Sequence, residues 1–494
     1  MRNSLFLRGG SIVDGTGTPP RRGDLLIDDG LIAALLEPGE PVPDGDHEVI
    51  DVSGRMVCPG FIDAHSHDDL AVVARPDLDF KVSQGVTTVI VGNCGLGAVP
   101  ITKATRSDLL GPEGRLTAVL GTGASHGWET LDDYAEAVED ASPSVNVGVL
   151  APHNVVRQLV CGAAERAATV GEVSQMCDVV TKMVGAGALG LSTGLAYSPG
   201  RAADRAELFA LARAAVHAGG VYASHIRDEA DHVNEATAEA VDIGEHAGHP
   251  AHISHLKALG RSNWGKVGQL LDQIEAAGAT CDAYPYTAAS TFLREALVAG
   301  GATTPIPPEE VFIAYSANHP STVGRNLRDL SEEWGITVET VVTRLETPTP
   351  GTSVVYFGMS DQDVATVLAD PRCMFGTDGV PTLDGAPHPR LYGTFPRVLG
   401  HMVRDQRVLS FTEAIRKATS LPAETFGIVQ RGRIERGWHA DITVVDPARV
   451  TDTADYRHPK RYATGIDLVI VNGRTTWRAG EHTGAAAGRI IRHP

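Results

Sequence analysis

The 494-residue sequence has few cysteines, an excess of acidic over basic side chains and no long apolar run. Its 6 cysteines include no Cys-x-x-Cys pair, so neither a zinc ribbon nor a disulfide framework is indicated. The formal net charge of −19 argues against nucleic acid or an anionic membrane as a partner. No run approaches the about 20 apolar residues that span a bilayer, and the first residues are too polar for a signal peptide. We therefore expect a cytoplasmic protein, and the composition leaves a homo-oligomer open.

Strand-like segments occupy both ends of the chain. Residues 1–57 and 426–494 alternate short apolar runs with Gly and Asp turn signals, and Asn472-Gly473 is a strong hairpin signal. We expect the two ends to pair into one composite β-sandwich domain.

Apolar strand-like runs alternate with alanine-rich helical stretches between residues 58 and 425. This alternation predicts an α/β fold of parallel strands with crossover helices. About eight such units, with reactive side chains after many different strands, favour a (β/α)8 TIM barrel over an open sheet. The rhythm breaks between about residues 291 and 352. There we expect an inserted subdomain that covers the strand ends.

The stretch PGFIDAHSHDD places two histidines after a predicted buried strand, MVCPGFIDA. Alternate residues of a strand point to the same side, so His65 and His67 present two imidazoles to one point. Further potential metal ligands each close a later apolar run: Cys94, His225, His255 and Asp378. In a parallel barrel all such ends lie on one face. Each residue alone fits a satisfied core group equally well, but the joint pattern predicts a metal site.

The ligand types favour zinc. Imidazole and thiolate suit zinc better than magnesium or calcium, which prefer oxygen. A Cys–His–His set leaves a fourth position for water, whose pKa a metal lowers from about 15.7 to about 7. Asp378 is then the predicted general base and acid, which takes a proton from the water and returns it to the leaving amine. The alternative for Asp378 is a turn residue in GTDG.

The chain resembles the amidohydrolase superfamily, and within it the N-acyl-D-amino-acid deacylases (D-aminoacylases). The resemblance covers essentially the whole chain and rests on the ordered motifs PGFIDAHSHDD, VGNCG, LSTGLAYSPG, YASHIRDE, HISHLKALG, DAYPYTAAST and GTDG. It implies a distorted TIM barrel with a small β-sandwich, and one tightly held zinc on Cys94, His225 and His255. It also implies a weaker second site at His65 and His67, with Cys94 shared in the place where many relatives carry a modified lysine.

The same resemblance implies a set of substrate contacts. Tyr284, Ser290 and Arg390 resemble carboxylate-binding residues, and Tyr197 resembles a substrate-pocket residue. Strand parity adds Lys257, because it lies two residues after His255 and so points to the same side. Arginine is favoured for bidentate carboxylate binding. The alternative for Arg390 is a surface arginine near a turn. The alternative for Tyr284 is a core aromatic residue whose hydroxyl is hydrogen-bonded.

Two other histidines are not expected at the metal. The PHNVVR segment departs from the family's usual turn, so His153 is given no role. His252 differs in strand parity from His255, so we expect it to face away from the metal and to have no role.

Three functional hypotheses follow. The first is zinc-dependent hydrolysis of the amide bond of a small N-acyl-D-amino acid, with the D preference implied by the resemblance alone. The second is a related hydrolase of a cyclic amide, such as a hydantoin or a dihydroorotate-like ring. Those relatives generally carry a lysine between two metals, so Cys94 argues against it. The third is a non-catalytic metal-binding barrel, against which Asp378 argues.

Overall fold

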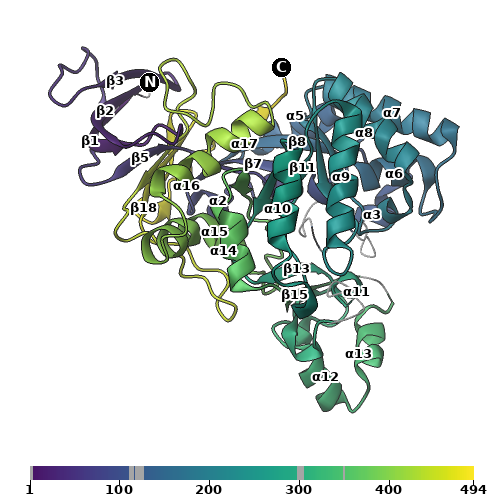
Figure 1. Ribbon diagram of the computed structural model, residues 1–494. Coiled ribbons are helices and arrows are strands. Elements are labelled where there is room, and N and C mark those ends of the chain that lie inside the picture. The colour runs from purple at the N-terminus through teal and green to yellow at the C-terminus, as the bar shows by residue number, and fades with distance from the viewer. Residues whose placement is uncertain (1–3, 111–115, 117–118, 120–126, 298–304, 349–350) are drawn as a thin grey trace.

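The computed structural model describes residues 4–110, 116, 119, 127–297, 305–348 and 351–494 (Figure 1). Three sheets organise these residues: a barrel sheet, a sheet built from both ends of the chain, and a small sheet within the predicted insertion. In this described part of the chain, no helix is both long enough and apolar enough to cross a membrane.

Eight parallel strands form the barrel, which confirms the predicted fold. Their order is β16-β12-β11-β10-β9-β8-β7-β6, and a short strand, β21, pairs with β8. The ends of this order meet, because the Asp378 amide donates to the His65 carbonyl at 2.7 Å. The VTTVIV run of β7 is buried throughout, as a strand covered on both faces requires. The bounds are β6 (Phe61–Asp63), β7 (Val86–Val91), β8 (Asn146–Pro152), β9 (Gly190–Gly194), β10 (Val221–His225), β11 (His252–Ile253), β12 (Thr280–Ala283), β16 (Cys373–Phe375) and β21 (Ile490–Ile491).

Helices surround the barrel strands (Figure 1). Thr130, Thr169 and Asp204 cap the first turns of α5, α7 and α8 by accepting hydrogen bonds from backbone amides. The helices are α1 (Ala71–Ala74), α2 (Asp79–Val82), α3 (Arg106–Leu110), α5 (Leu131–Ala141), α6 (His153–Cys161), α7 (Val170–Gly185), α8 (Arg205–His217), α9 (Val233–Ala247), α10 (Val267–Ala276), α14 (Asp361–Ala369), α15 (Arg390–Arg397), α16 (Phe411–Ala418) and α17 (Ser420–Thr425). Short 3₁₀ turns are η1 (Asn93–Gly95), η2 (Gly200–Ala202) and η3 (Arg261–Asn263), and a π-helix, η6 (Val398–Asp405), extends α15.

Strands from both ends of the chain form one nine-stranded sheet with the order β20-β19-β18-β17-β5-β1-β2-β3, in which β4 pairs with β1. Its apolar core contains side chains from both ends, including Leu5, Ile27, Ile442 and Ile470. The predicted Asn472-Gly473 hairpin joins β18 to β19, with positive φ at both residues. We propose this unit as the composite domain. Its strands are β1 (Leu5–Ile12), β2 (Arg21–Asp28), β3 (Leu31–Leu36), β4 (Glu48–Asp51), β5 (Met56–Pro59), β17 (Ile442–Val445), β18 (Ile466–Val471), β19 (Arg474–Arg478) and β20 (Glu481–His482).

The predicted strand MVCPGFIDA is two strands. The chain leaves the end sheet after β5 and enters the barrel at β6, with Gly60 between them. Gly60 donates its amide to the Asp441 carbonyl at 2.7 Å, and a Cβ there would lie 2.2 Å from Oγ1 of Thr87. The apolar run is continuous because both strands are buried, so hydrophobicity alone does not mark the break.

The described residues between 288 and 357, which include the predicted insertion at 291–352, form a three-stranded antiparallel sheet and three helices, of which α12 (Leu327–Trp334) and α13 (Val338–Leu345) project from the barrel (Figure 1). Leu327, Leu330 and Val341 of the helices pack into one core with Tyr284 and Tyr286, which follow β12. The predicted insertion, which we expect to cover the strand ends, thus shares an apolar core with the residues that follow β12. Its elements are β13 (Ala288–Phe292), α11 (Leu293–Ala296), η4 (Pro308–Glu310), β14 (Val311–Ser316), η5 (Pro320–Thr322), α12 (Leu327–Trp334), α13 (Val338–Leu345) and β15 (Thr352–Phe357).

Candidate metal centre and substrate cavity

The predicted ligands come together at the carboxyl ends of the barrel strands. They end or follow β6, β7, β10, β11 and β16, and each is at most 6% exposed: His65, His67, Cys94, His225, His255 and Asp378. Residues that are far apart in the sequence thus share one buried space, as the predicted strand-end register requires.

The Cys94 sulfur lies at the centre of the cluster. Its Sγ is 3.2 Å from Nε2 of His65 and 3.3 Å from Nε2 of His255. The His225 ring lies edge-on to that of His255, with centroids 4.4 Å apart. Burial alone would raise the pKa of the Cys94 thiol, but the neighbouring imidazoles lower it well below its usual range. The geometry therefore favours a thiolate.

Asp378 follows β16 and lies beside His65 and His67. Its Oδ1 is 3.3 Å from Nε2 of His67 and 3.7 Å from Nε2 of His65, and its Oδ2 is 2.9 Å from Nη1 of Arg390. Burial would raise the pKa of the Asp378 carboxyl, but the guanidinium and the imidazoles hold it well below its usual range. The side chain is therefore an ionised acceptor.

Three residues of the cluster have left-handed backbone conformations. The φ angles are 56° at Cys94, 35° at His255 and 45° at Asp378. Non-glycine residues rarely adopt such angles, which cost on the order of 1–3 kcal/mol each and concentrate at functional sites. The bends turn the chain sharply at the strand ends. A Cβ at Gly194 would lie 1.9 Å from the Cys94 carbonyl oxygen, so the Cys94 bend also requires glycine at position 194.

The donor set fits zinc. Potential ligand atoms lie within 4.8 Å of one another in three overlapping groups: His65–Cys94–His255, His65–His67–Asp378 and His225–Glu229–His255. Sulfur and imidazole together favour zinc over ions that prefer oxygen. Among the described residues, Nδ1 of His67 and Nδ1 of His225 are buried without a hydrogen-bond partner. The overlap of the groups fits two adjacent metal positions.

His252, for which we expected no role, is linked to a candidate ligand through Asp282. Oδ2 of Asp282 lies 2.9 Å from Nε2 of His252 and 3.2 Å from Nδ1 of His65. Asp282, on the neighbouring strand β12, thus joins the two imidazoles, and strand parity within β11 alone does not reveal this link. A carboxylate on the far nitrogen of a metal-binding histidine fixes its ring. His153 lies away from the cluster and pairs with Glu207 at 2.8 Å.

A buried lysine that sequence reasoning missed supports the His-x-His segment. Nζ of Lys81 lies 2.7 Å from Oδ2 of Asp63, 3.0 Å from Oδ2 of Asp68 and 2.8 Å from Oγ1 of Thr377, and the lysine is 0% exposed. This ammonium links the residues that flank His65 and His67 to the residue before Asp378. The sequence signal was the pair of aspartates on either side of the two histidines.

The predicted substrate residues occupy two layers. Tyr197, Lys257 and Ser290 line the cavity that also contains Cys94 and Asp378. The ammonium of Lys257 lies 2.6 Å from Oε1 of Glu229, a residue that sequence reasoning also missed. An acidic residue four positions after the ligand His225 was its only sequence signal.

Tyr284 and Arg390 lie behind this lining. The Arg390 guanidinium carbon is 4.4 Å from the centroid of the Tyr284 ring, and Arg390 is 0% exposed. In the described part of the chain, the Tyr284 hydroxyl and the Nε group of Arg390 have no hydrogen-bond partner, whereas Nη1 of Arg390 forms the ion pair with Asp378. Buried unpaired donors of this kind are suited to an incoming anion.

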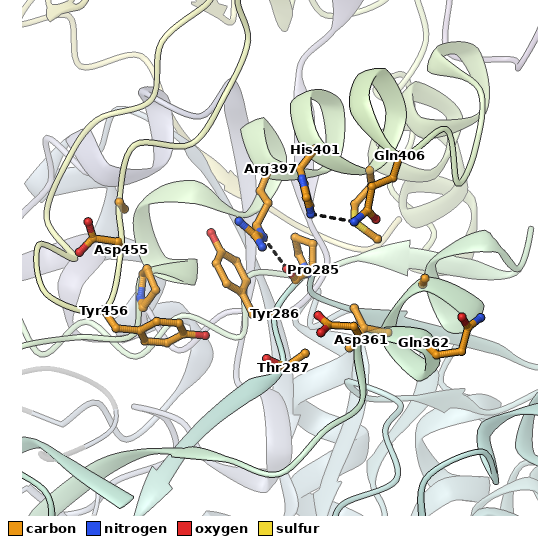
Figure 2. Close-up of a pocket in the computed structure, with 15 residues that line it drawn as sticks. Pro285, Tyr286, Thr287, Asp361, Gln362, Arg397, His401, Gln406, Asp455 and Tyr456 are labelled. Carbon is orange, nitrogen blue, oxygen red and sulfur yellow. Dashed lines mark hydrogen bonds between the residues drawn. The ribbon is translucent and has the colours of Figure 1, made fainter. Parts of the chain in front are cut away.

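Two larger cavities flank these residues. One, of about 380 Å³, opens beside His225 and is lined by Tyr197 and Tyr356. The other, of about 320 Å³, is formed between η6, α14 and the loop after β12. Figure 2 shows Arg397 of α15 and His401 of η6 on one side of it. This cavity is lined by none of the candidate metal ligands. We therefore assign the chemistry to the cavity beside His225 and to the smaller one lined by Cys94 and Asp378.

Comparison with known proteins agrees with this geometry. The amidohydrolase family model matches residues 48–300 and 332–477. The D-aminoacylase of Alcaligenes xylosoxydans xylosoxydans is 39% identical over 493 residues, which cover 99% of this chain and 97% of that protein. The N-acyl-D-aspartate deacylase of the same organism is 38% identical, with 97% of this chain and 93% of that protein covered.

A solved structure matches equally well. It is the N-acyl-D-glutamate deacylase from Bordetella bronchiseptica, complexed with zinc and a phosphonate inhibitor that mimics the tetrahedral intermediate of its reaction. Its TM-score is 0.91 at 37% identity, and the match covers 100% of both chains. With matches of this length and identity, the chain belongs to the amidohydrolase family, among the N-acyl-D-amino-acid deacylases.

Proposed function

We propose that this protein hydrolyses the amide bond of N-acyl-D-amino acids, with zinc as its cofactor, to a D-amino acid and a carboxylate. The observation that carries the proposal is the buried Cys94 sulfur between the imidazoles of His65 and His255, with the Asp378 carboxyl group beside them. The activities of the similar proteins support the substrate class.

The metal would be held by the cluster already described. Cys94, His225 and His255 would bind the tight zinc, and His65 and His67 would form the weaker position with Cys94 shared. When bound, zinc supplies a Lewis acid that polarises the amide carbonyl and lowers the pKa of water.

Asp378 moves the proton in this scheme. As an ionised acceptor it takes a proton from the attacking water and returns it to the amine nitrogen that leaves. Its neighbour Arg390 orients the carboxylate through Oδ2 and leaves Oδ1 directed at the histidines. The Nε group of the same guanidinium and the Tyr284 hydroxyl are left to donate to the substrate carboxylate.

A panel of N-acyl-D- and N-acyl-L-amino acids with neutral, acidic and basic side chains tests this function. We expect turnover of D substrates only, and no turnover of hydantoin. Preferred hydrolysis of the ring would support the cyclic-amide hypothesis instead. Zinc binding with no turnover of any substrate would support the non-catalytic barrel.

Substitution Arg390→Lys tests carboxylate binding. Lysine keeps the charge but loses the planar fork, so we expect kcat/KM to fall about 10–100-fold, mainly through KM. Arg397→Lys is the matched control, because Arg397 lies in the same helix but pairs with Asp452 beside the cavity in Figure 2. Steady-state kinetics on one N-acyl-D-amino acid measure both. Equal KM values for Arg390→Lys and the unsubstituted protein would contradict the assignment.

The cysteines support a cytoplasmic location for this protein. All six are free, and Cys281 lies directly opposite Cys373 on neighbouring strands without a disulfide. Unpaired cysteines are usual where thiols are kept reduced. A homo-oligomer stays a prediction.

A further inference from the structure

Glu229 contacts both the His255 ring and the Lys257 ammonium beside it. It lies in the loop between β10 and α9, and its Oε1 is 2.6 Å from Nζ of Lys257 and 3.0 Å from Nδ1 of His255. The Lys257 ammonium is itself 2.7 Å from the same Nδ1. A carboxylate and an ammonium therefore compete for one ring nitrogen.

The outcome of this competition decides what the other nitrogen can do. A neutral imidazole carries its proton on one nitrogen only. If Lys257 donates to Nδ1, the proton is on Nε2, which faces the Cys94 sulfur and then has no lone pair for a metal. If Nδ1 carries the proton and donates to Glu229, Nε2 is left unprotonated toward Cys94.

We propose that Glu229 is a positioning residue that accepts the Nδ1–H of His255, keeps Nε2 free for the metal, and forms an ion pair with the Lys257 ammonium beside the ring. The inference rests on the proposed zinc site and adds a residue to it. A carboxylate in this position orients the ring and supports metal binding through it.

The contacts favour this role over direct ligation by Glu229. Its Oε1 approaches His255 from the Nδ1 side, whereas the sulfur lies on the Nε2 side. Its distance to Nε2 of His225 is 3.9 Å, longer than either contact to Lys257 or His255. The Glu229 carboxylate thus lies outside the group around the Cys94 sulfur and contacts the Nδ1 side of His255.

Zinc titration of the full-length, metal-free protein tests the proposal without substrate. We expect Glu229→Gln, which keeps the shape but removes the charge, to weaken zinc binding about 10–100-fold in competition with a chromophoric chelator. Glu239→Gln is the matched control, because Glu239 pairs with Arg227 through a similar salt bridge and does not contact the cluster. We expect the control to bind zinc like the unsubstituted protein.

A second substitution separates this role from simple support of the loop. Without the Glu229 carboxylate, the Lys257 ammonium is the charged donor beside Nδ1, so Lys257→Met in the Glu229→Gln background should restore zinc affinity to within about threefold of the unsubstituted protein. Unchanged zinc affinity in Glu229→Gln would overturn the proposal. A loss that Lys257→Met does not restore would overturn it as well. Failure of the unsubstituted protein itself to bind zinc would instead refute the proposed function.

Neutron diffraction from zinc-loaded crystals gives a readout that needs no variant. We expect a deuteron on Nδ1 of His255 that points at Glu229. An Nδ1 without a deuteron, or a deuteron there that points away from Glu229, would overturn the proposal even if every variant failed to fold.

Discussion

Replacement of Cys94 by alanine is expected to release the tight zinc and to abolish turnover. The thiolate is the one donor shared by both predicted metal positions, and it lies within 3.3 Å of two ligand histidines. Loss of a direct ligand should weaken binding by more than the about 10–100-fold that supporting residues contribute. Metal content after gel filtration and the rate on an N-acyl-D-amino acid measure the two effects.

Cys161→Ala provides the control for this experiment. Cys161 is a half-buried thiol at the end of α6 with no contact to the cluster, so its loss should leave zinc content unchanged. A Cys94→Ala protein that kept stoichiometric zinc and a normal rate would refute the sulfur-centred site.

Replacement of Asp378 by alanine is expected to keep the tight zinc yet lose most of the rate. General acid–base groups contribute about 10²–10⁴-fold, and we expect a fall of kcat in that range. The zinc position on Cys94, His225 and His255 does not include this carboxylate, so zinc content should stay near one per chain. The contrast with Cys94→Ala separates proton transfer from metal binding.

Asp378→Asn refines this comparison. The amide keeps the size of the side chain beside Arg390 but cannot accept the proton, so its rate should be as low as that of the alanine variant. Activity within a few-fold of the unsubstituted protein in either variant would exclude Asp378 as the base.

The barrel and the ligand positions could be predicted because each depends on local pattern. Apolar runs mark the strands, and in a parallel barrel the residue that closes a run must lie on the same face as all the others. His225 and Asp378 are brought together by that rule alone, although many residues separate them.

The supporting residues could not be found in this way. Lys81, Glu229 and Asp282 act through contacts between elements that are distant in the sequence, and the weak sequence signals that accompany Lys81 and Glu229 do not identify those partners. Their importance comes from burial, since a charged group inside a protein requires a partner. Only the tertiary structure supplies those partners.

The break at Gly60 was missed for a different reason. Hydrophobicity is continuous across the run, while the change of sheet is set by pairing of β5 with β17, almost four hundred residues later in the chain. A single sequence does not encode that pairing in any local signal.

This long-range pairing has a consequence for how the protein is made. On the ribosome β5 emerges early, yet the strand that covers it, Ile442–Val445, is translated after the whole barrel. Until then β5 offers an open hydrogen-bonding edge to neighbouring nascent chains, the kind of surface that chaperones shield. Premature termination before residue 442 would leave that edge permanently exposed, so we expect such fragments to aggregate even where the barrel strands are complete.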